Sequence, residues 1–281
     1  MASPPDDAPA LLVAGKLVVD EVLVCDAPPV AGSAQRARER LVTGGGQVWH
    51  TARAAARAGA TVAVTGWCGG DADSARLRGE LVAAGIADHL ATHDPASRST
   101  VLVHGGDRIV VSHGSSGYVD PRAIPGTALD GLALLHLDAY VLDAVAGDAL
   151  VALASAAAAR GLPITLEAPR VDKCASSAAW LALLPPLRAV LGRPDEIAAV
   201  SRYLAAPPSI TVAHDQDRPV ITQHGSSQIT TPVPQVEVAS LGAGDRFAGG
   251  WLAARLRGAD LADAAAAGIA AAGLREAGPL D

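Results

Sequence analysis

The chain has 281 residues, and its formal net charge at pH 7 is -7. Half of its residues are hydrophobic but only 3% are aromatic, so its core must be built from alanine, valine and leucine. The length fits one large domain with a small appendage. The acidic balance, with basic residues scattered along the chain, argues against nucleic acids and membrane surfaces as partners.

The first ten residues are polar and proline-rich, so we expect residues 1–10 to be a disordered lead-in and not a signal peptide. Aspartates interrupt the longest apolar stretches, so we expect no membrane span. The three cysteines lie far apart, without the spacing of metal ligands. They are typical of reduced core thiols in a cytoplasmic protein: Cys25, Cys68 and Cys174.

The first predicted strands contain an uncommon acidic pair. Leu11 to Val13 predicts a buried strand, and Leu17 to Val24 is a second strand-like run. Within this run, Asp20 and Glu21 place carboxylates where apolar residues are expected. Either the strand lies at an edge with both side chains in water, or one of them meets a ligand. We expect residues 18–42 to form an excursion from the main sheet.

Three glycines, Gly44 to Gly46, precede a predicted helix over Gln47 to Ala58. Glycines before a helix N-terminus let a ligand approach the backbone closely, and a flexible joint is the alternative. A strand over Thr61 to Thr65 and a helix over Ser74 to Ala84 follow.

A hairpin then interrupts the alternation of strands and helices, with its strands at Thr100–Val103 and Arg108–Val111. Beyond it the alternation resumes. The predicted strands are Leu132–Leu137, Pro163–Glu167, Arg188–Leu191 and Ile210–Ala213, and the predicted helices are Asp148–Ala159, Ser176–Leu184, Asp195–Leu204 and Leu261–Ala272. Pro219–Thr222 and Gln228–Thr230 form a second predicted hairpin. This order predicts an α/β fold with a mostly parallel central sheet covered on both faces. Residues 18–42 and 98–111 would form a small β lid on a domain that spans residues 11–281.

The stretch Ser240-Leu241-Gly242-Ala243-Gly244-Asp245 leads into a predicted apolar helix. The free amides of the first helical turn form an anion site, and Asp245 beside them could take a proton from a hydroxyl. This is the arrangement of a phosphoryl-transfer centre. A dinucleotide fingerprint is excluded because Phe247 occupies its third glycine position and too little chain follows. The alternative is a capped helix, in which Asp245 binds its own first-turn amides.

These motifs resemble the two signatures of the ribokinase (PfkB) family of carbohydrate and nucleoside kinases. The C-terminal signature is matched by Gly242-Ala243-Gly244-Asp245 with Phe247 after it, and the N-terminal one in part by Gly45-Gly46-Gln47-Val48-Trp49-His50-Thr51-Ala52. The resemblance runs from about Leu11 to about Gly273. It implies a ribokinase-like three-layer sandwich with a small β lid that often pairs with the lid of a second subunit.

The resemblance also implies a chemistry, the transfer of the γ-phosphoryl group of ATP, with Mg²⁺, to a hydroxyl of a sugar, a sugar derivative or a nucleoside. Asp245 would be the catalytic base, and the amides of Gly242 to Gly244 would form the anion hole. Asp20 would accept hydrogen bonds from sugar hydroxyls in a pocket lined by Gly45 and Gly46. Whether a monovalent cation binds near the anion loop is left open.

On the acceptor side the chain departs from the family's pattern. His50 replaces an asparagine of the pocket and follows the bulky Trp49. A nucleoside base could stack on Trp49, and a charged His50 would favour an acidic substrate. The alternative for His50 is a histidine on a helix face with a backbone partner. Arg170, after a core strand, would contact substrate or phosphate, or would form only an ion pair.

The donor side departs further. Arg193 replaces the asparagine of the family's Asn-x-x-Glu, and Glu196 is retained. The resemblance implies that this motif lies near magnesium and phosphate. Arg193 could clamp a phosphate, or Asp195 could simply cap the helix. His214 is a candidate for nucleotide contact, because it lies where the family usually shows Thr-x-Gly-x-x-Gly; here Asp215 and Asp217 add negative charge.

Two other functions therefore stay open. The altered donor segment favours a non-catalytic binding or regulatory protein on the same fold, whereas the intact Asp245 opposes it. A kinase that uses another phosphoryl donor, such as ADP or pyrophosphate, is the second.

Overall fold

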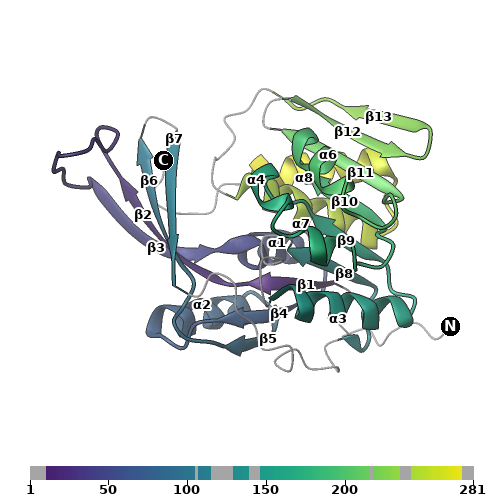
Figure 1. Cartoon of the computed structure of the whole chain (residues 1–281), viewed down its shortest axis with the longest axis horizontal. Helices are drawn as coiled ribbons and strands as arrows, with labels where there is room; N and C mark the ends of the chain where they lie inside the picture. Colours follow the sequence, from purple (N-terminus) through teal and green to yellow (C-terminus); the bar gives the residue numbers. More distant parts are fainter. Residues whose placement is uncertain are drawn as a thin grey trace.

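The computed structural model describes residues 11–104, 107–114, 129–138, 146–215, 218–234 and 242–273. These residues form a large sheet between two layers of helices, and a smaller sheet that projects to one side (Figure 1). The predicted α/β architecture, with a mostly parallel central sheet and a small second sheet, is confirmed. The expected lead-in, residues 1–10, lies outside the described residues.

The large sheet has nine strands in the order β13-β12-β11-β10-β9-β8-β1-β4-β5. The seven strands from β11 along this order to β5 pair in parallel with their neighbours. The last two, β12 and β13, are antiparallel: β12 pairs with both β11 and β13. In chain order the strands are β1 (Leu11–Lys16), β4 (Val62–Cys68), β5 (Ala87–Thr92), β8 (Leu134–Asp138), β9 (Ile164–Glu167), β10 (Ala189–Gly192), β11 (Ile210–Asp215), β12 (Arg218–His224) and β13 (Ser227–Thr231). The carboxyl ends of the parallel strands meet at one edge, where ligands bind in open α/β sheets.

Helices cover both faces because the strands alternate their buried side chains between two apolar cores. In β1, Leu12 and Ala14 face one core, whereas Leu11 and Val13 face the other. The first core is closed by α3 (Ala146–Ala159), α4 (Val171–Cys174), α5 (Ala178–Leu181) and α6 (Pro194–Ser201), and the second by α1 (Gly46–Arg57), α2 (Ala72–Ala83), α7 (Ala243–Leu256) and α8 (Leu261–Gly273).

Two glycines let α7 pack tightly between α1 and α8. A Cβ at Gly249 would lie 2.4 Å from the carbonyl oxygen of Thr51 in α1, and one at Gly250 would lie 2.7 Å from that of Ala267 in α8. Thr51 Oγ1 also donates to the carbonyl oxygen of Asp245 at 3.2 Å. These contacts fix the start of α7 against the middle of α1.

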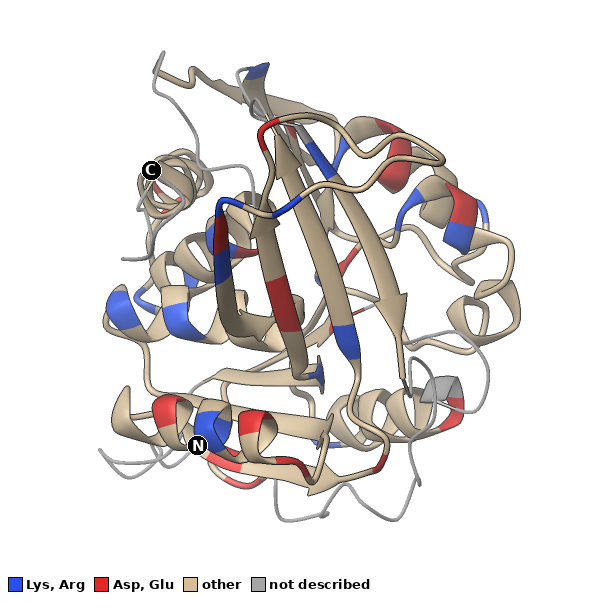
Figure 2. Cartoon of the chain, turned by 90° about the vertical axis from the view of Figure 1, so that its left-hand side faces the viewer, with Lys and Arg blue, Asp and Glu red and all other residues tan. Residues whose placement is uncertain are grey.

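The small sheet has the order β3-β2-β6-β7, with β2 (Val18–Val24), β3 (Glu39–Gly45), β6 (Arg98–His104) and β7 (Asp107–His113). Figure 2 views it from outside and shows strands with few, scattered charges. Its base is tied to the main body, because Arg98 pairs with Asp71 (2.5 Å) and Asp73 (3.1 Å) at the start of α2. Strand β3 runs directly into α1, so the small sheet and α1 are positioned together.

The structure corrects several predicted elements. Sequence patterns did not predict β3 or β5, which are edge strands. Edge strands expose one side and carry polar residues, which weakens the alternation that indicates a strand. The helix predicted over Ser176–Leu184 is only α5, after the separate short α4. The three cysteines are free and buried, as predicted. Within the described residues, no helix is long and apolar enough to cross a membrane.

One buried polar residue in the sheet makes stability depend on pH. His136 in β8 is fully buried, its Nδ1 lies 2.9 Å from Thr165 Oγ1, and burial lowers its pKa to about 3. Between about pH 6.5 and 3 the unfolded chain therefore binds a proton that the folded chain does not. As pH falls through that range, we expect the free energy of unfolding to decrease more steeply in the wild type than in His136→Leu. Urea denaturation at pH 4.5 and 7.5 measures the difference; equal pH dependence in both proteins would contradict it.

Candidate functional site

The start of α7 has the features of an anion site. Its N-cap is Gly242, whose φ of +67° lies in the left-handed region that favours glycine. The N-cap residue is a glycine and has no side chain with which to cap this end, so the first-turn amides form the anion site that the sequence predicts. The first turn also contains Ala243 and Gly244.

Asp245 is half-buried in the first turn of α7, and burial raises the pKa of its carboxyl. The charge of Glu167 adds to this effect, whereas His50, Arg246 and His214 oppose it, with His50 the strongest of the three. A carboxylate with a raised pKa is a better base at neutral pH. Four chain segments that are distant in sequence therefore place charges around one carboxylate.

His50 lies on α1 and is buried against the turn that begins α7. A Cβ at Gly242 would lie only 2.7 Å from Cγ and Cδ2 of its imidazole. A glycine is therefore required at position 242 both for backbone conformation and for space. The structure brings the two glycine motifs together, because His50 belongs to the N-terminal motif and Gly242 to the C-terminal one.

Asp20 in β2 is buried beside the first glycine motif. A Cβ at Gly45 would lie 2.1 Å from its Oδ2, so only glycine fits there. Gly46 has a φ of +80° and lies against the carbonyl oxygen of Lys16. The alternative that these glycines form a flexible joint does not fit such close neighbours. Burial raises the pKa of Asp20 to about 7; a hydrogen bond with Ser99 opposes this shift and the charge of Asp245 adds to it.

The raised pKa of Asp20 predicts a cost in stability at neutral pH. Between about pH 4 and 7 the folded chain keeps a proton that the unfolded chain has lost, so the free energy of unfolding falls as pH rises. We expect Asp20→Asn to melt at a higher temperature than the wild type at pH 8, with the difference vanishing toward pH 4. Melting curves at both values measure it. An Asp20→Asn variant that melts below the wild type by the same amount at both pH values would contradict a raised pKa for Asp20.

Trp49 does not contact this pocket in the way the sequence suggested. Its side chain is 1% exposed and packs in the second core, with Arg53 stacked 4.3 Å from its ring centroid. A Cβ at Gly44 would lie 2.2 Å from the indole. The expectation that a base could stack on Trp49 does not fit this structure, because the indole is buried in the second core and has protein neighbours.

Asp138 is a further buried carboxylate at the edge of the sheet where ligands bind, and it was not among the predicted site residues. It is buried at the carboxyl end of β8, and a Cβ at Gly15, in the neighbouring β1, would lie 2.9 Å from its Oδ2. The signal was an aspartate directly after an apolar strand, at the sheet edge where ligands bind.

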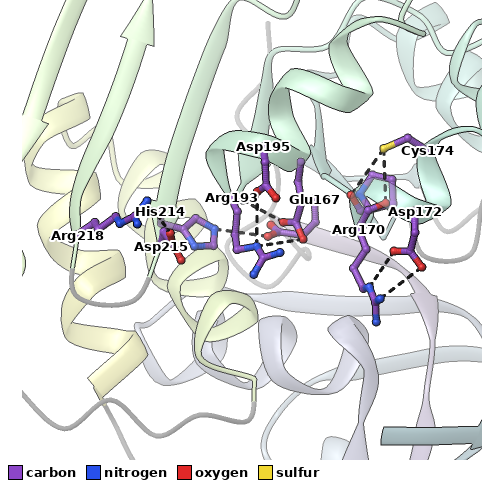
Figure 3. A network of polar contacts seen from close by, with 11 residues as sticks. Glu167, Arg170, Asp172, Cys174, Arg193, Asp195, His214, Asp215 and Arg218 are labelled. Carbon is purple, nitrogen blue, oxygen red and sulfur yellow. Dashed lines mark hydrogen bonds and ion pairs between the residues drawn. The ribbon is translucent and has the colours of Figure 1, made fainter. Parts of the chain in front are cut away.

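His214 in β11, which also acts electrostatically on Asp245, pairs with Glu167 at the end of β9. Figure 3 shows the imidazole directed at this carboxylate; Nε2 and Oε1 are 3.5 Å apart. The ring also packs on Phe247 of α7, with centroids 4.5 Å apart. Burial raises the pKa of Glu167, and His214 opposes the shift. Sequence analysis placed Glu167 at a strand end but did not include it among the site residues.

Arg193 and Glu196 form the N-terminal cap of α6. The backbone N–H of Arg193 donates to Glu196 Oε2 at 3.0 Å, and Arg193 Nε lies 3.4 Å from Glu196 Oε1. The carboxylate that accepts the cap bond is thus Glu196 and not Asp195. Burial raises the pKa of Glu196.

The structure does not bring Arg170 into this group. Its exposed guanidinium pairs with Asp172 at 3.0 Å, away from the pair of His214 and Glu167 (Figure 3). Of the two interpretations of Arg170, the ion pair at a strand end is the one that the structure has. Arg218 lies 3.4 Å from Asp215, so one of the two added aspartates has a cationic partner. Asp217 lies outside the described residues, as does the loop just before Gly242 where a monovalent cation was considered.

The described residues contain no cluster of three or more His, Cys, Asp or Glu side chains that could hold a metal ion directly. Three carboxylates nonetheless interact in sequence: Glu167 raises the pKa of Asp245, and Glu196 raises the pKa of Glu167. Such a group suits Mg²⁺ that arrives with phosphates and keeps several of its waters.

Comparisons with known proteins agree with this architecture. The profile of the pfkB family carbohydrate kinases matches residues 9–275. No curated protein sequence matches the chain significantly. Among solved structures, a probable sugar kinase from Rhizobium etli CFN 42 superposes with a TM-score of 0.83 at 18% identity, covering 95% of this chain and 92% of that one.

Two further structures are similar. An adenosine kinase from Sinorhizobium meliloti has a TM-score of 0.81 at 19% identity, over 97% of this chain and 93% of that one. A ribokinase from Cryptococcus neoformans var. grubii serotype A, solved in complex with ADP, has a TM-score of 0.74 at 19% identity, over 95% and 92%. At these identities the likeness establishes the fold, which is ribokinase-like.

Proposed function

This chain belongs to the pfkB family of carbohydrate kinases, and we propose that it transfers the γ-phosphoryl group of ATP to a hydroxyl of a sugar or sugar derivative, a nucleoside being the second candidate acceptor. One observation carries the proposal. Asp245 lies in the first turn of a helix whose N-cap is a glycine, and its carboxyl interacts electrostatically with Asp20, Glu167 and His214.

On the acceptor side, Asp20 accepts hydrogen bonds from substrate hydroxyls, within a pocket lined by Gly45 and Gly46 and bordered by His50. A buried carboxylate that destabilises the free protein gains hydrogen-bond donors when such a substrate binds. Asp138 is a second carboxylate suited to hydroxyl groups. Trp49 and Arg170 have no part in this proposal.

In the transfer step, Asp245 takes the proton of the attacking hydroxyl as its oxygen bonds to the γ-phosphorus. The bond from that phosphorus to the oxygen shared with the β-phosphate breaks, and ADP leaves. The amides of Gly242, Ala243 and Gly244 donate to the oxygens of the transferred group, where negative charge is concentrated.

On the donor side, Arg193, Glu196 and His214 are the proposed nucleotide contacts. Mg²⁺, when bound with the nucleotide, neutralises charge on its phosphates. Glu196 would hold it indirectly, through water.

A thermal-shift panel of sugars and nucleosides, each with and without Mg-ATP, tests this proposal. A ligand present at 100 times its Kd adds about 2.7 kcal/mol to the free energy of unfolding, which raises the melting temperature by several degrees. We expect stabilisation by Mg-ATP and by one class of hydroxyl-bearing acceptor. Stabilisation by acceptors with no response to any nucleotide would instead favour a binding protein, and a response to ADP or pyrophosphate alone would favour another donor.

The small sheet is also where we propose that a second copy of the chain pairs. Its edge strand β7 exposes three consecutive apolar side chains, Ile109, Val110 and Val111, each about half exposed. Sedimentation velocity is expected to show a dimer that Val110→Asp dissociates. A monomeric wild type at micromolar concentration would contradict the pairing.

A further inference from the structure

A row of four polar side chains crosses the small sheet, and the carboxyl of Asp20 is one of them. Asp20 in β2 pairs with Ser99 in the neighbouring β6, and Ser99 pairs with Ser112 in β7. Directly paired residues of neighbouring strands point to the same face of a sheet, so these side chains lie next to one another. Thr43 of β3 is paired with Asp20 on its other side and completes this polar row.

Two hydrogen bonds connect three members of the polar row. One joins the side chains of Ser99 and Asp20, and in the other Oγ of Ser99 lies 3.2 Å from Oγ of Ser112. Ser99 is 8% exposed, whereas serine is usually found at the surface. The carboxyl group also has a close backbone neighbour, because a Cβ at Gly45 would lie 2.1 Å and 2.6 Å from its two oxygens. Ser99 and Gly45 together therefore define the position of this carboxyl.

The direction of these hydrogen bonds follows from what each group can donate. An ionised carboxyl only accepts, so Ser99 gives its single hydroxyl hydrogen to Asp20, and its Oγ is left to accept from Ser112. The neighbouring strands contribute no charge to the row, since Thr43, Ser99 and Ser112 are all neutral. The charge that acts on the carboxyl is that of Asp245 on α7, and it disfavours the ionised form, whereas the bond from Ser99 favours it.

Resting on the proposed kinase function, we propose that Ser99 is a positioning residue for acceptor recognition and that Ser112 supports it. The hydroxyl of Ser99 holds the carboxylate of Asp20 in place over Gly45, where it accepts hydrogen bonds from the hydroxyls of the acceptor. Because Ser99 and Ser112 belong to β6 and β7, the small sheet then contributes to acceptor affinity through Asp20, and does more than cover the pocket.

Kinetics with the sugar or nucleoside that the wild type phosphorylates test this role. Ser99→Ala should raise the KM for this acceptor at pH 7 by at least about threefold, since an ordinary hydrogen bond is worth about twofold to tenfold in affinity. The kcat should stay within about twofold, because Asp245 and the anion hole are unchanged. Loss of the bond raises the pKa of Asp20, so the defect in KM should shrink toward pH 9, where the carboxyl is ionised in both proteins.

Further variants separate positioning from a general effect on the sheet. Ser99→Thr keeps the hydroxyl and should restore the wild-type KM. Ser112 acts through Ser99, so Ser112→Ala should have a smaller effect, and the double alanine variant should match Ser99→Ala alone. The matched control is Thr100→Val, which removes a hydroxyl from the opposite face of β6 and should leave the KM unchanged. An unchanged KM in Ser99→Ala, or fully additive effects in the double variant, would overturn the proposal.

Melting temperatures test the hydrogen bond without any acceptor. The pKa of folded Asp20 lies above its unfolded value, so stability is lost as pH rises toward the folded pKa. Ser99→Ala raises that pKa further, so it should fall increasingly below the wild type between pH 4 and pH 9, and not in an Asp20→Asn background. A difference that is independent of pH would overturn the positioning of Asp20 by Ser99, even in an active kinase. A wild type that phosphorylates no acceptor, with the pH-dependent difference present, would overturn the proposed function and the role in acceptor recognition, while the bond itself would stand.

Discussion

Asp245→Asn is expected to lower kcat by about 10³-fold or more while the KM for the acceptor stays within a few-fold of the wild type. Asparagine keeps the size and some of the hydrogen bonding of aspartate but cannot take the proton of the attacking hydroxyl, and general-base catalysis contributes about 10²–10⁴-fold. The loss of charge beside the phosphates also removes electrostatic repulsion, so binding of ATP should not weaken. Initial rates with saturating ATP and a varied acceptor measure both constants.

The matched control is Asp263→Asn, which removes an exposed carboxylate from the first turn of the neighbouring α8. Both substitutions lose a negative charge at a helix N-terminus, so their effects on helix stability should be similar. Only the variant at position 245 should lose turnover. An Asp245→Asn enzyme with more than about a tenth of wild-type kcat would remove this residue from the role of base.

Gly242→Ala is expected to lower kcat/KM by at least about a hundredfold. Its Cβ would have to displace the imidazole of His50, and alanine at a φ of +67° is strained by about 1–2 kcal/mol. Because the backbone of this turn carries the anion-hole donors, a small displacement misaligns them, and loss of one such donor typically costs about 10²–10³-fold.

Gly258→Ala separates this effect from backbone strain. Gly258 follows α7 with a φ of +83°, and its Cβ would have no neighbour within 4 Å. Gly258→Ala should lose a few degrees of melting temperature from backbone strain alone and Gly242→Ala somewhat more, but only Gly242→Ala should lose activity. Equal activity in the two variants would show that the turn at Gly242 does not position the anion hole.

The residues that sequence alone identified are those whose chemistry is local. A glycine turn before a helix, followed by an aspartate, predicts an anion site and a base because the amides and the carboxylate lie within one helical turn. Gly45 and Gly46 were found in the same way. For Asp20 the signal was a carboxylate in an apolar strand, and the structure gives the reason, since it is buried against Gly45.

Contacts between distant segments could not be predicted in this way. Glu167 and His214 meet because β9 and β11 flank β10 in the sheet, an order that neither strand's own sequence specifies. The misassignment of Trp49 has a similar origin. Strand β3 was not predicted, so the glycine that covers the indole, Gly44, was placed in a loop instead of a strand.

The most direct test of the central claim is acceptor-dependent formation of ADP from Mg-ATP, measured across a panel of sugars and nucleosides with wild type and Asp245→Asn in parallel. We expect one class of acceptor to stimulate ADP release by the wild type, a phosphorylated acceptor to accumulate in equal amount, and the variant to form neither product. ADP release at the same rate in both proteins, or independent of every acceptor, would contradict it.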